Sequence, residues 1–102
     1  MSVKRKIRVL IVDDSAFVRK AVARMLGEAS DIEVVGTASD GEEGLAKAHE
    51  LRPDVVTLDI KMPRLGGLET LERLMAERPV PVLLLSTLTQ EGAEVTLRAL
   101  EL

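Results

Sequence analysis

Two hydrophobic periods alternate along the chain, and this alternation is the feature that most restricts its fold. Four short runs of aliphatic residues, many of them β-branched, are each followed by a stretch in which apolar residues recur every three to four positions. Runs of the first kind predict strands buried on both faces, and the longer spacing predicts amphipathic helices. We therefore expect strands at residues 7–12, 32–38, 55–58 and 82–85, and helices in between and at 91–102.

Turn-forming residues precede the predicted helices, which supports the division of the chain into strands and helices. Asp13 to Ser15 precede the first helix, Asp40 and Gly41 open the second, and a loop with Pro and Gly at 62–67 precedes the third. The stripes consist of Phe17, Val18, Ala21, Val22, Met25 and Leu26, then Leu45 and Ala48, then Leu68, Leu71, Leu74 and Met75, and finally Ala93, Leu97 and Leu100. Strict alternation of this kind predicts an α/β fold, a doubly wound parallel sheet with helices on both faces.

The composition narrows the class of protein. The 102 residues are enough for one domain, and 46% hydrophobic with 30% charged residues is typical of a folded globular chain. Phe17 is the one aromatic residue, so we expect an aliphatic core. A net charge of −3 argues against nucleic acid as a partner, and the absence of cysteine suits a reducing cytoplasm. The apolar run after Lys6 is too short for a signal peptide or a membrane span, so we expect a soluble, cytoplasmic protein.

Acidic residues follow two of the predicted strands. Asp13 and Asp14 come after the first strand and Asp59 after the third, while Ser86 and Thr87 follow the fourth. In open parallel sheets, ligands bind beyond the carboxyl ends of the strands. If the first and third strands are neighbours, three carboxylates crowd one edge and repel one another, and Mg²⁺ is the natural counterion.

A simpler interpretation is that these acids cap helices, and Asp14 or Ser15 would suit the start of the first helix. Three acids at two strand ends, with hydroxyls at a third, favour a site for phosphoryl transfer. That reaction needs little covalent help but much neutralisation of charge, and a metal bound to both groups would let a carboxylate approach a phosphoryl group.

Three motifs resemble the receiver domains of two-component response regulators. They are Val9-Leu10-Ile11-Val12-Asp13-Asp14-Ser15, Leu58-Asp59-Ile60-Lys61-Met62-Pro63 and Leu84-Leu85-Ser86-Thr87. The similarity extends over essentially the whole chain, 1–102. It is closer still to the N-terminal receivers of chemotaxis protein-glutamate methylesterases, through the stretches 15–20, 32–41, 56–59 and 86–94.

The resemblance implies a role for each motif residue. Asp59 would be the phosphorylated aspartate, and Asp14, Asp59 and the backbone carbonyl of Lys61 would bind Mg²⁺, with Asp13 acting chiefly through water. Ser86 would be the switch hydroxyl. The phosphodonor would be a phosphohistidine on a chemotaxis histidine kinase, and phosphorylation would regulate a C-terminal methylesterase domain that this chain does not contain. The receiver itself would not be a classical enzyme, although its parent protein would be a carboxylic ester hydrolase.

The chain departs from the family pattern in two places. Gly66 stands where receivers usually carry an acidic residue, so we expect a more mobile start to the third helix. The flavodoxin-like receiver fold, with strand order 2-1-3-4-5, also has a fifth strand bearing an essential lysine, and a fifth helix. Residues 1–102 contain no counterpart of them, so the receiver would be incomplete at its C-terminus and phosphorylation slow. Strand four would then be an exposed apolar edge, through which we expect self-association.

Two other functions compete with a phosphoacceptor. A phosphatase or mutase of the haloacid dehalogenase kind also uses an Asp after a parallel strand, but it needs a second Asp where this chain has Lys61. An assembly module with a vestigial acidic site is the other alternative. His49, the one histidine, has no partner motif and is interpreted as a solvated helix position.

Overall fold

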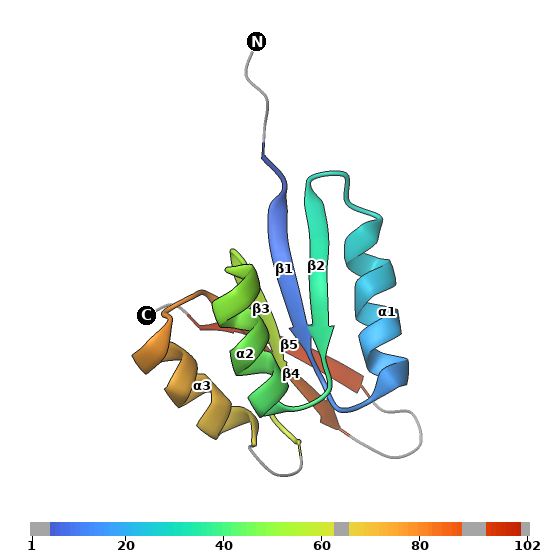
Figure 1. Ribbon diagram of the computed structural model, residues 1–102. Helices are drawn as coiled ribbons and strands as arrows, with labels where there is room; N and C mark the ends of the chain where they lie inside the picture. The colour runs from blue at the N-terminus through green and yellow to red at the C-terminus, as the bar shows by residue number, and fades with distance from the viewer. Residues whose placement is uncertain (1–4, 63–65, 89–93, 101–102) are drawn as a thin grey trace.

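The structure, a computed structural model, contains a five-stranded sheet with helices on both faces (Figure 1). It describes residues 5–62, 66–88 and 94–100, and it describes 86–88 and 94–100 by their backbone alone. The strands are β1 (Ile7–Val12), β2 (Ile32–Ala38), β3 (Val55–Asp59), β4 (Val82–Leu88) and β5 (Glu94–Leu100). The helices are α1 (Ala16–Gly27), α2 (Gly41–Leu51) and α3 (Gly67–Glu77). The sheet order is β2-β1-β3-β4-β5, and the first four strands pair in parallel, which confirms the predicted doubly wound, flavodoxin-like arrangement.

The sheet separates two apolar layers because successive strand residues point to opposite faces. Figure 1 shows α2 and α3 on one side of the sheet and α1 on the other. The layer under α2 and α3 contains Leu10, Val12, Ala38, Leu45, Ala48, Val56, Leu58, Leu74, Val80, Val82 and Leu84. The layer under α1 is smaller and contains Val9, Ile11, Val22 and Leu85. The core is aliphatic, as the composition predicted.

The helices begin where the sequence provides capping side chains. Ser15 is the N-cap of α1, and its Oγ accepts a hydrogen bond from Val18 N at 3.2 Å. Asp40 caps α2 by accepting from Glu43 N at 2.8 Å. Helix α2 ends at Leu51, and the φ of 50° at its C-cap residue Arg52 turns the chain toward β3. Gly66 gives α3 no capping side chain, although Thr70 Oγ1 donates to the Gly66 carbonyl at 2.8 Å.

Three apolar residues of the predicted stripes are exposed. Phe17 is 81% exposed and Met25 58%, whereas Val22 is the buried residue of α1. Leu68, at the start of α3, is 60% exposed. The apolar stripes are therefore not buried throughout, because a single helix on a sheet contacts it along one side and leaves the flanks of a wide stripe in solvent.

The predicted helix at 91–102 is also wrong within the described residues. Glu94–Leu100 forms β5 and pairs antiparallel with β4, from Val82 opposite Leu100 to Leu88 opposite Glu94. Val95, Leu97 and Ala99 also fall at a period of two, so the sequence suits a strand as well as a helix. The free hydrogen-bonding groups along β4 favour the strand, a case in which tertiary context overrides local preference. Strand β4 is therefore not the exposed edge that the sequence predicted, and self-association through it is not supported.

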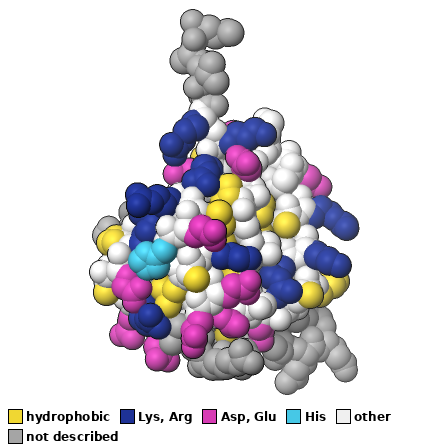
Figure 2. All heavy atoms as spheres, viewed as in Figure 1, with side chains coloured by type: hydrophobic (Ala, Val, Ile, Leu, Met, Phe, Trp, Pro, Cys, Tyr) yellow, Lys and Arg dark blue, Asp and Glu magenta, His cyan; other side chains and the backbone are white. Residues whose placement is uncertain are grey.

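Charged side chains of both signs are interspersed over the face formed by α2 and α3, as Figure 2 shows. Two of the ion pairs on this face join Lys47 to Glu43 at 3.1 Å and Arg73 to Glu77 at 3.0 Å, each one helical turn apart. Within the described ranges, no helix is both long and apolar enough to cross a bilayer.

Truncation of Leu74 is expected to destabilise the fold through the layer between α3 and the sheet. Leu74 is 1% exposed, so Leu74→Ala leaves a cavity and should lower the free energy of unfolding by about 2–4 kcal/mol. Leu68→Ala, the same change six residues earlier on α3, should cost less than about 0.5 kcal/mol. Urea unfolding followed by circular dichroism measures both, and equal losses would contradict the packing described here.

Candidate functional site

Two neighbouring parallel strands bring the predicted acidic residues together. Strands β1 and β3 pair in register up to Val12 opposite Leu58, so the next residues, Asp13 and Asp59, leave the same edge of the sheet at the same level. One carboxylate oxygen from each of Asp13, Asp14 and Asp59 lies within 4.8 Å of the others. The expected meeting of three carboxylates is confirmed, and we call these residues the acidic cluster.

Backbone amides orient the two buried members of the acidic cluster. Asp13 is 1% exposed, and its Oδ1 accepts a hydrogen bond from Ser15 N at 2.8 Å. Asp59 is 5% exposed, and its Oδ1 accepts from Lys61 N at 3.1 Å. Asp14 is exposed to solvent. The cluster therefore has a fixed inner side and an open outer side.

The helix-capping alternative is answered by the same contacts. Ser15, not Asp14, caps α1, and Asp13 supports the turn by accepting from Ser15 N. Capping thus accounts for the hydroxyl and for one oxygen of Asp13. It does not account for Asp14 or for the position of Asp59.

Burial and mutual repulsion make the ionised cluster unfavourable. Burial raises the pKa of Asp59 to about 6, and the charges of Asp13 and Asp14 add to this effect, while the bond from Lys61 N opposes it. The pKa of Asp13 is also raised, chiefly by burial, against the opposing effects of the Ser15 amide and the Arg19 charge. At neutral pH the folded chain must therefore hold carboxylate charges close together, at a cost that the Arg19 charge only partly offsets at Asp13.

The oxygen ligands fit a hard divalent cation. Asp13 Oδ2 is buried and has no hydrogen-bond partner among the described atoms, and a buried carboxylate oxygen left in this way needs a cation or a water. Mg²⁺ prefers a few carboxylate or carbonyl oxygens and retains several waters, which suits a cluster that is closed on one side and open on the other. The residues present fit Mg²⁺.

The other predicted site residues lie near the same edge. Lys61 is two residues beyond Asp59, and its carbonyl remains the predicted third protein ligand. Ser86 lies in β4 directly after Leu85, the register partner of Asp59. Its side chain falls outside the described part of the structure, as do Pro63 and Thr89.

His49 lies in the last turn of α2 and is not part of the acidic cluster. Its Nε2 is 3.0 Å from Glu77 Oε1 of α3, so the exposed histidine has a partner that the sequence did not indicate.

Two residues to which the sequence assigned no role support the site. A Cβ on Gly67 would lie 2.3 Å from the Asp59 carbonyl oxygen, so glycine lets the start of α3 approach the end of β3. Arg19 Nη1 donates to the Asp13 carbonyl at 2.7 Å. The amino-acid sequence gives only a weak signal for the roles of Gly67 and Arg19, because both contacts depend on how helices pack against strand ends.

Gly67→Ala is expected to disturb the site. The added methyl would overlap the backbone of Asp59 and Ile60, shift the end of β3, and reduce Mg²⁺ affinity by roughly tenfold. Gly66→Ala is the matched control, since its Cβ would meet nothing closer than the Met62 carbonyl at 3.9 Å. Isothermal titration with Mg²⁺ compares them, and equal affinities for both variants would count against the close approach.

Asp59→Asn is expected to stabilise the metal-free chain in a pH-dependent way. The pKa of Asp59 rises from an ordinary 3.8 to about 6, so the folded chain binds the proton more tightly and loses stability as pH rises through this window. Without divalent cations, the variant should be more stable than the unsubstituted chain by about 1–3 kcal/mol at pH 7.5 and by less at pH 4. Chemical unfolding in EDTA at both pH values measures this. A gain that is the same at both would contradict it.

Comparison with known sequences places the chain in a family. The sequence model of the response regulator receiver domain family matches residues 9–102. Protein-glutamate methylesterase/protein-glutamine glutaminase of Lawsonia intracellularis (strain PHE/MN1-00) is 57% identical over 94 residues, which are 92% of this chain and 26% of that protein. The protein of the same name from Symbiobacterium thermophilum is 59% identical over 100 residues, 98% of this chain and 28% of that protein. The chain thus spans about a quarter of the length of these relatives.

Solved structures agree with the sequence comparison. The response regulator domain of Thermotoga maritima CheB matches with a TM-score of 0.80 and 50% identity, over 87% of this chain and 66% of that one. CheY in a CheX-CheY-BeF3-Mg complex from Borrelia burgdorferi matches with a TM-score of 0.74 and 36% identity, over 85% of this chain and 66% of that one. The predicted resemblance, including its leaning toward methylesterase receivers, is confirmed. The chain belongs to the response regulator receiver domain family.

Proposed function

We propose that this chain accepts a phosphoryl group on Asp59, with Mg²⁺ held directly by Asp14, Asp59 and the Lys61 carbonyl and by Asp13 chiefly through water. The observation that carries the proposal is the acidic cluster, whose oxygens lie within 4.8 Å of one another at the carboxyl ends of β1 and β3. Membership of the receiver family gives the cluster its chemical context.

The donor in this proposal is a phosphohistidine of a chemotaxis histidine kinase. An Asp59 carboxylate oxygen forms a bond to phosphorus as the phosphorus–nitrogen bond breaks, and the imidazole nitrogen leaves with the electron pair. Bound Mg²⁺ supplies the positive charge that lets two anionic groups approach. The Lys61 amide holds the Asp59 carboxyl in place during this approach.

Ser86 is proposed as the switch hydroxyl that responds to the new phosphoryl group. It follows Leu85, which pairs with Asp59 across β3 and β4, so the residue lies on the strand beside the acceptor. A hydroxyl there can donate to a phosphoryl oxygen. The signal would then pass along β4 into the segment that follows it.

The regulated partner is proposed from the relatives. Those named protein-glutamate methylesterase are roughly three and a half times as long as this chain, which matches about a quarter of each. We infer that the receiver regulates a C-terminal methylesterase domain in such a protein, in the cytoplasm where its kinase acts. The Borrelia burgdorferi CheY structure, which contains BeF3 and Mg, supports beryllofluoride as a stand-in for the phosphoryl group.

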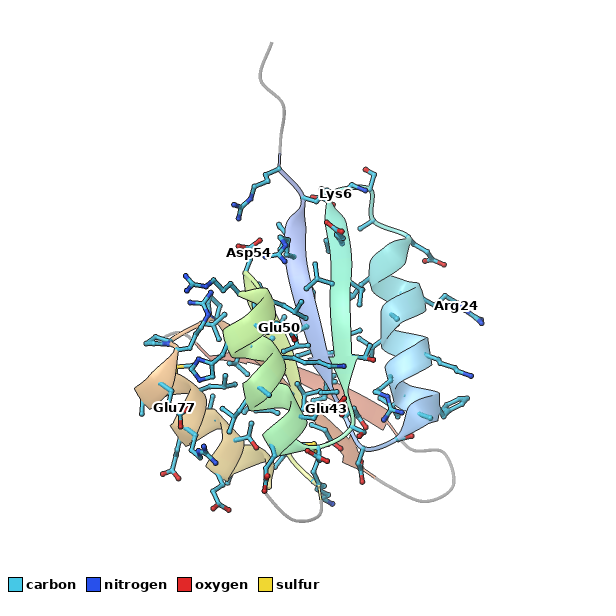
Figure 3. The ribbon with its side chains drawn as sticks, viewed as in Figure 1. Lys6, Arg24, Glu43, Glu50, Asp54 and Glu77 are labelled. Carbon is cyan, nitrogen blue, oxygen red and sulfur yellow. The ribbon has the colours of Figure 1, made fainter. Side chains whose placement is uncertain are left out.

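Titration with Mg²⁺ and beryllofluoride, followed by amide NMR shifts, tests the proposal. We expect shifts at Asp59, Lys61 and Ser86 that disappear in Asp59→Ala. Asp54→Ala is the control, because Asp54 lies at the opposite end of β3 from Asp59 and accepts hydrogen bonds from Arg5 and Arg8 there (Figure 3). Absence of these shifts in the unsubstituted chain would contradict the phosphoacceptor proposal and favour an assembly module with a vestigial cluster.

A further inference from the structure

We propose that Arg19 is a positioning residue of the acidic cluster, holding Asp13 and Asp14 in the arrangement that binds Mg²⁺. The inference rests on the proposed function and deepens it, because it identifies a residue of α1 that prepares the metal site. Arg19 would act through the backbone between the two acids and would not itself bind the metal.

The contact of Arg19 is with the peptide group that joins two members of the cluster. Its Nη1 donates to the Asp13 carbonyl at 2.7 Å, and this carbonyl belongs to the Asp13–Asp14 peptide. A hydrogen bond from a charged donor is about twice as strong as a neutral one. Fixing this one oxygen therefore restrains the directions in which both carboxylates leave the chain.

The anchor is itself rigid. Arg19 N donates to the Ser15 carbonyl at 2.9 Å, so the arginine is part of the first turn of α1, and its side chain is half-buried. On the other side of the loop, Asp13 N donates to the Ala38 carbonyl at 3.0 Å and Asp13 Oδ1 accepts from Ser15 N. The Arg19 guanidinium adds a third contact, to the Asp13 carbonyl. The turn from β1 to α1 is therefore held by β2, by the helix cap and by the guanidinium.

The charge of Arg19 alone would have the opposite effect on a metal. A guanidinium whose charge acts on Asp13 repels a cation bound at the acidic cluster, so its removal should strengthen Mg²⁺ binding if only charge matters. Loss of a positioning contact should weaken binding instead, since contacts that orient metal ligands typically contribute 10–100-fold in affinity. The sign of the change therefore separates the two roles.

The choice of metal gives a second separation. Mg²⁺ requires near-ideal octahedral geometry, whereas Ca²⁺ tolerates irregular arrangements of oxygen ligands. A misplaced Asp13–Asp14 peptide should thus weaken Mg²⁺ binding more than Ca²⁺ binding. A change of charge acts on both divalent cations in the same direction.

The experiment is isothermal titration of Mg²⁺ and of Ca²⁺ into the unsubstituted chain, Arg19→Gln, Arg19→Lys and Arg24→Gln. We expect Arg19→Gln to weaken Mg²⁺ binding by roughly tenfold and Ca²⁺ binding by less. Arg19→Lys keeps the charge but lacks the planar donor set, so it should show a smaller loss of the same kind. Arg24→Gln is the matched control, because Arg24 lies on the same helix and points away from the sheet (Figure 3).

Thermal unfolding without metal shows whether each variant folds. Unchanged or tighter Mg²⁺ binding by Arg19→Gln overturns the inference and leaves the proposed function intact. Equal losses for Mg²⁺ and Ca²⁺ also overturn it, since they point to a general loss of structure. Absence of Mg²⁺ binding by the unsubstituted chain overturns both the inference and the metal-dependent function.

Discussion

The repulsion among three carboxylates at one edge of the sheet is the constraint on which the site depends. Parallel pairing of β1 with β3 brings Asp13 and Asp59 to the same level, and Asp14 follows directly. Burial of two of the three makes their charges more costly than they would be in water. Such an arrangement is unfavourable for folding alone, and a divalent cation can offset its cost. The aliphatic core behind it supplies the stability that lets the chain keep this strained edge.

The sequence predicted the sheet and the cluster because both depend on local and repeated signals. β1, β2 and α2 follow from apolar runs and from Asp40, whose capping role is evident from its place before a helical stripe. Asp13, Asp14 and Asp59 could be grouped because strands that alternate with helices share one carboxyl edge. These inferences needed only the order of residues and the rule that parallel strands point the same way.

Other features depended on contacts that the order of residues does not reveal. Glu94–Leu100 suits either a helix or a strand, and the open side of β4 decided between them. Phe17 and Met25 look like core residues in the sequence, yet they lie on the flank of α1 away from its contact with the sheet. In the sequence, Arg19 resembles the basic residues of solvated helix faces. Only the fold shows that its side chain reaches the Asp13 carbonyl. In each case the deciding partner is distant in the chain or on another element.

The absent side chain at Gly67 makes α3 sensitive to the end of β3. Gly67 N donates to the Ile60 carbonyl at 3.1 Å, and its Cα lies so close to the Asp59 backbone that a single methyl would not fit between them. Backbones packed this tightly cannot move separately, since protein interiors transmit displacement and do not absorb it. A displacement of the Asp59 backbone is therefore mechanically linked to the first turn of α3, with no side chain between the two.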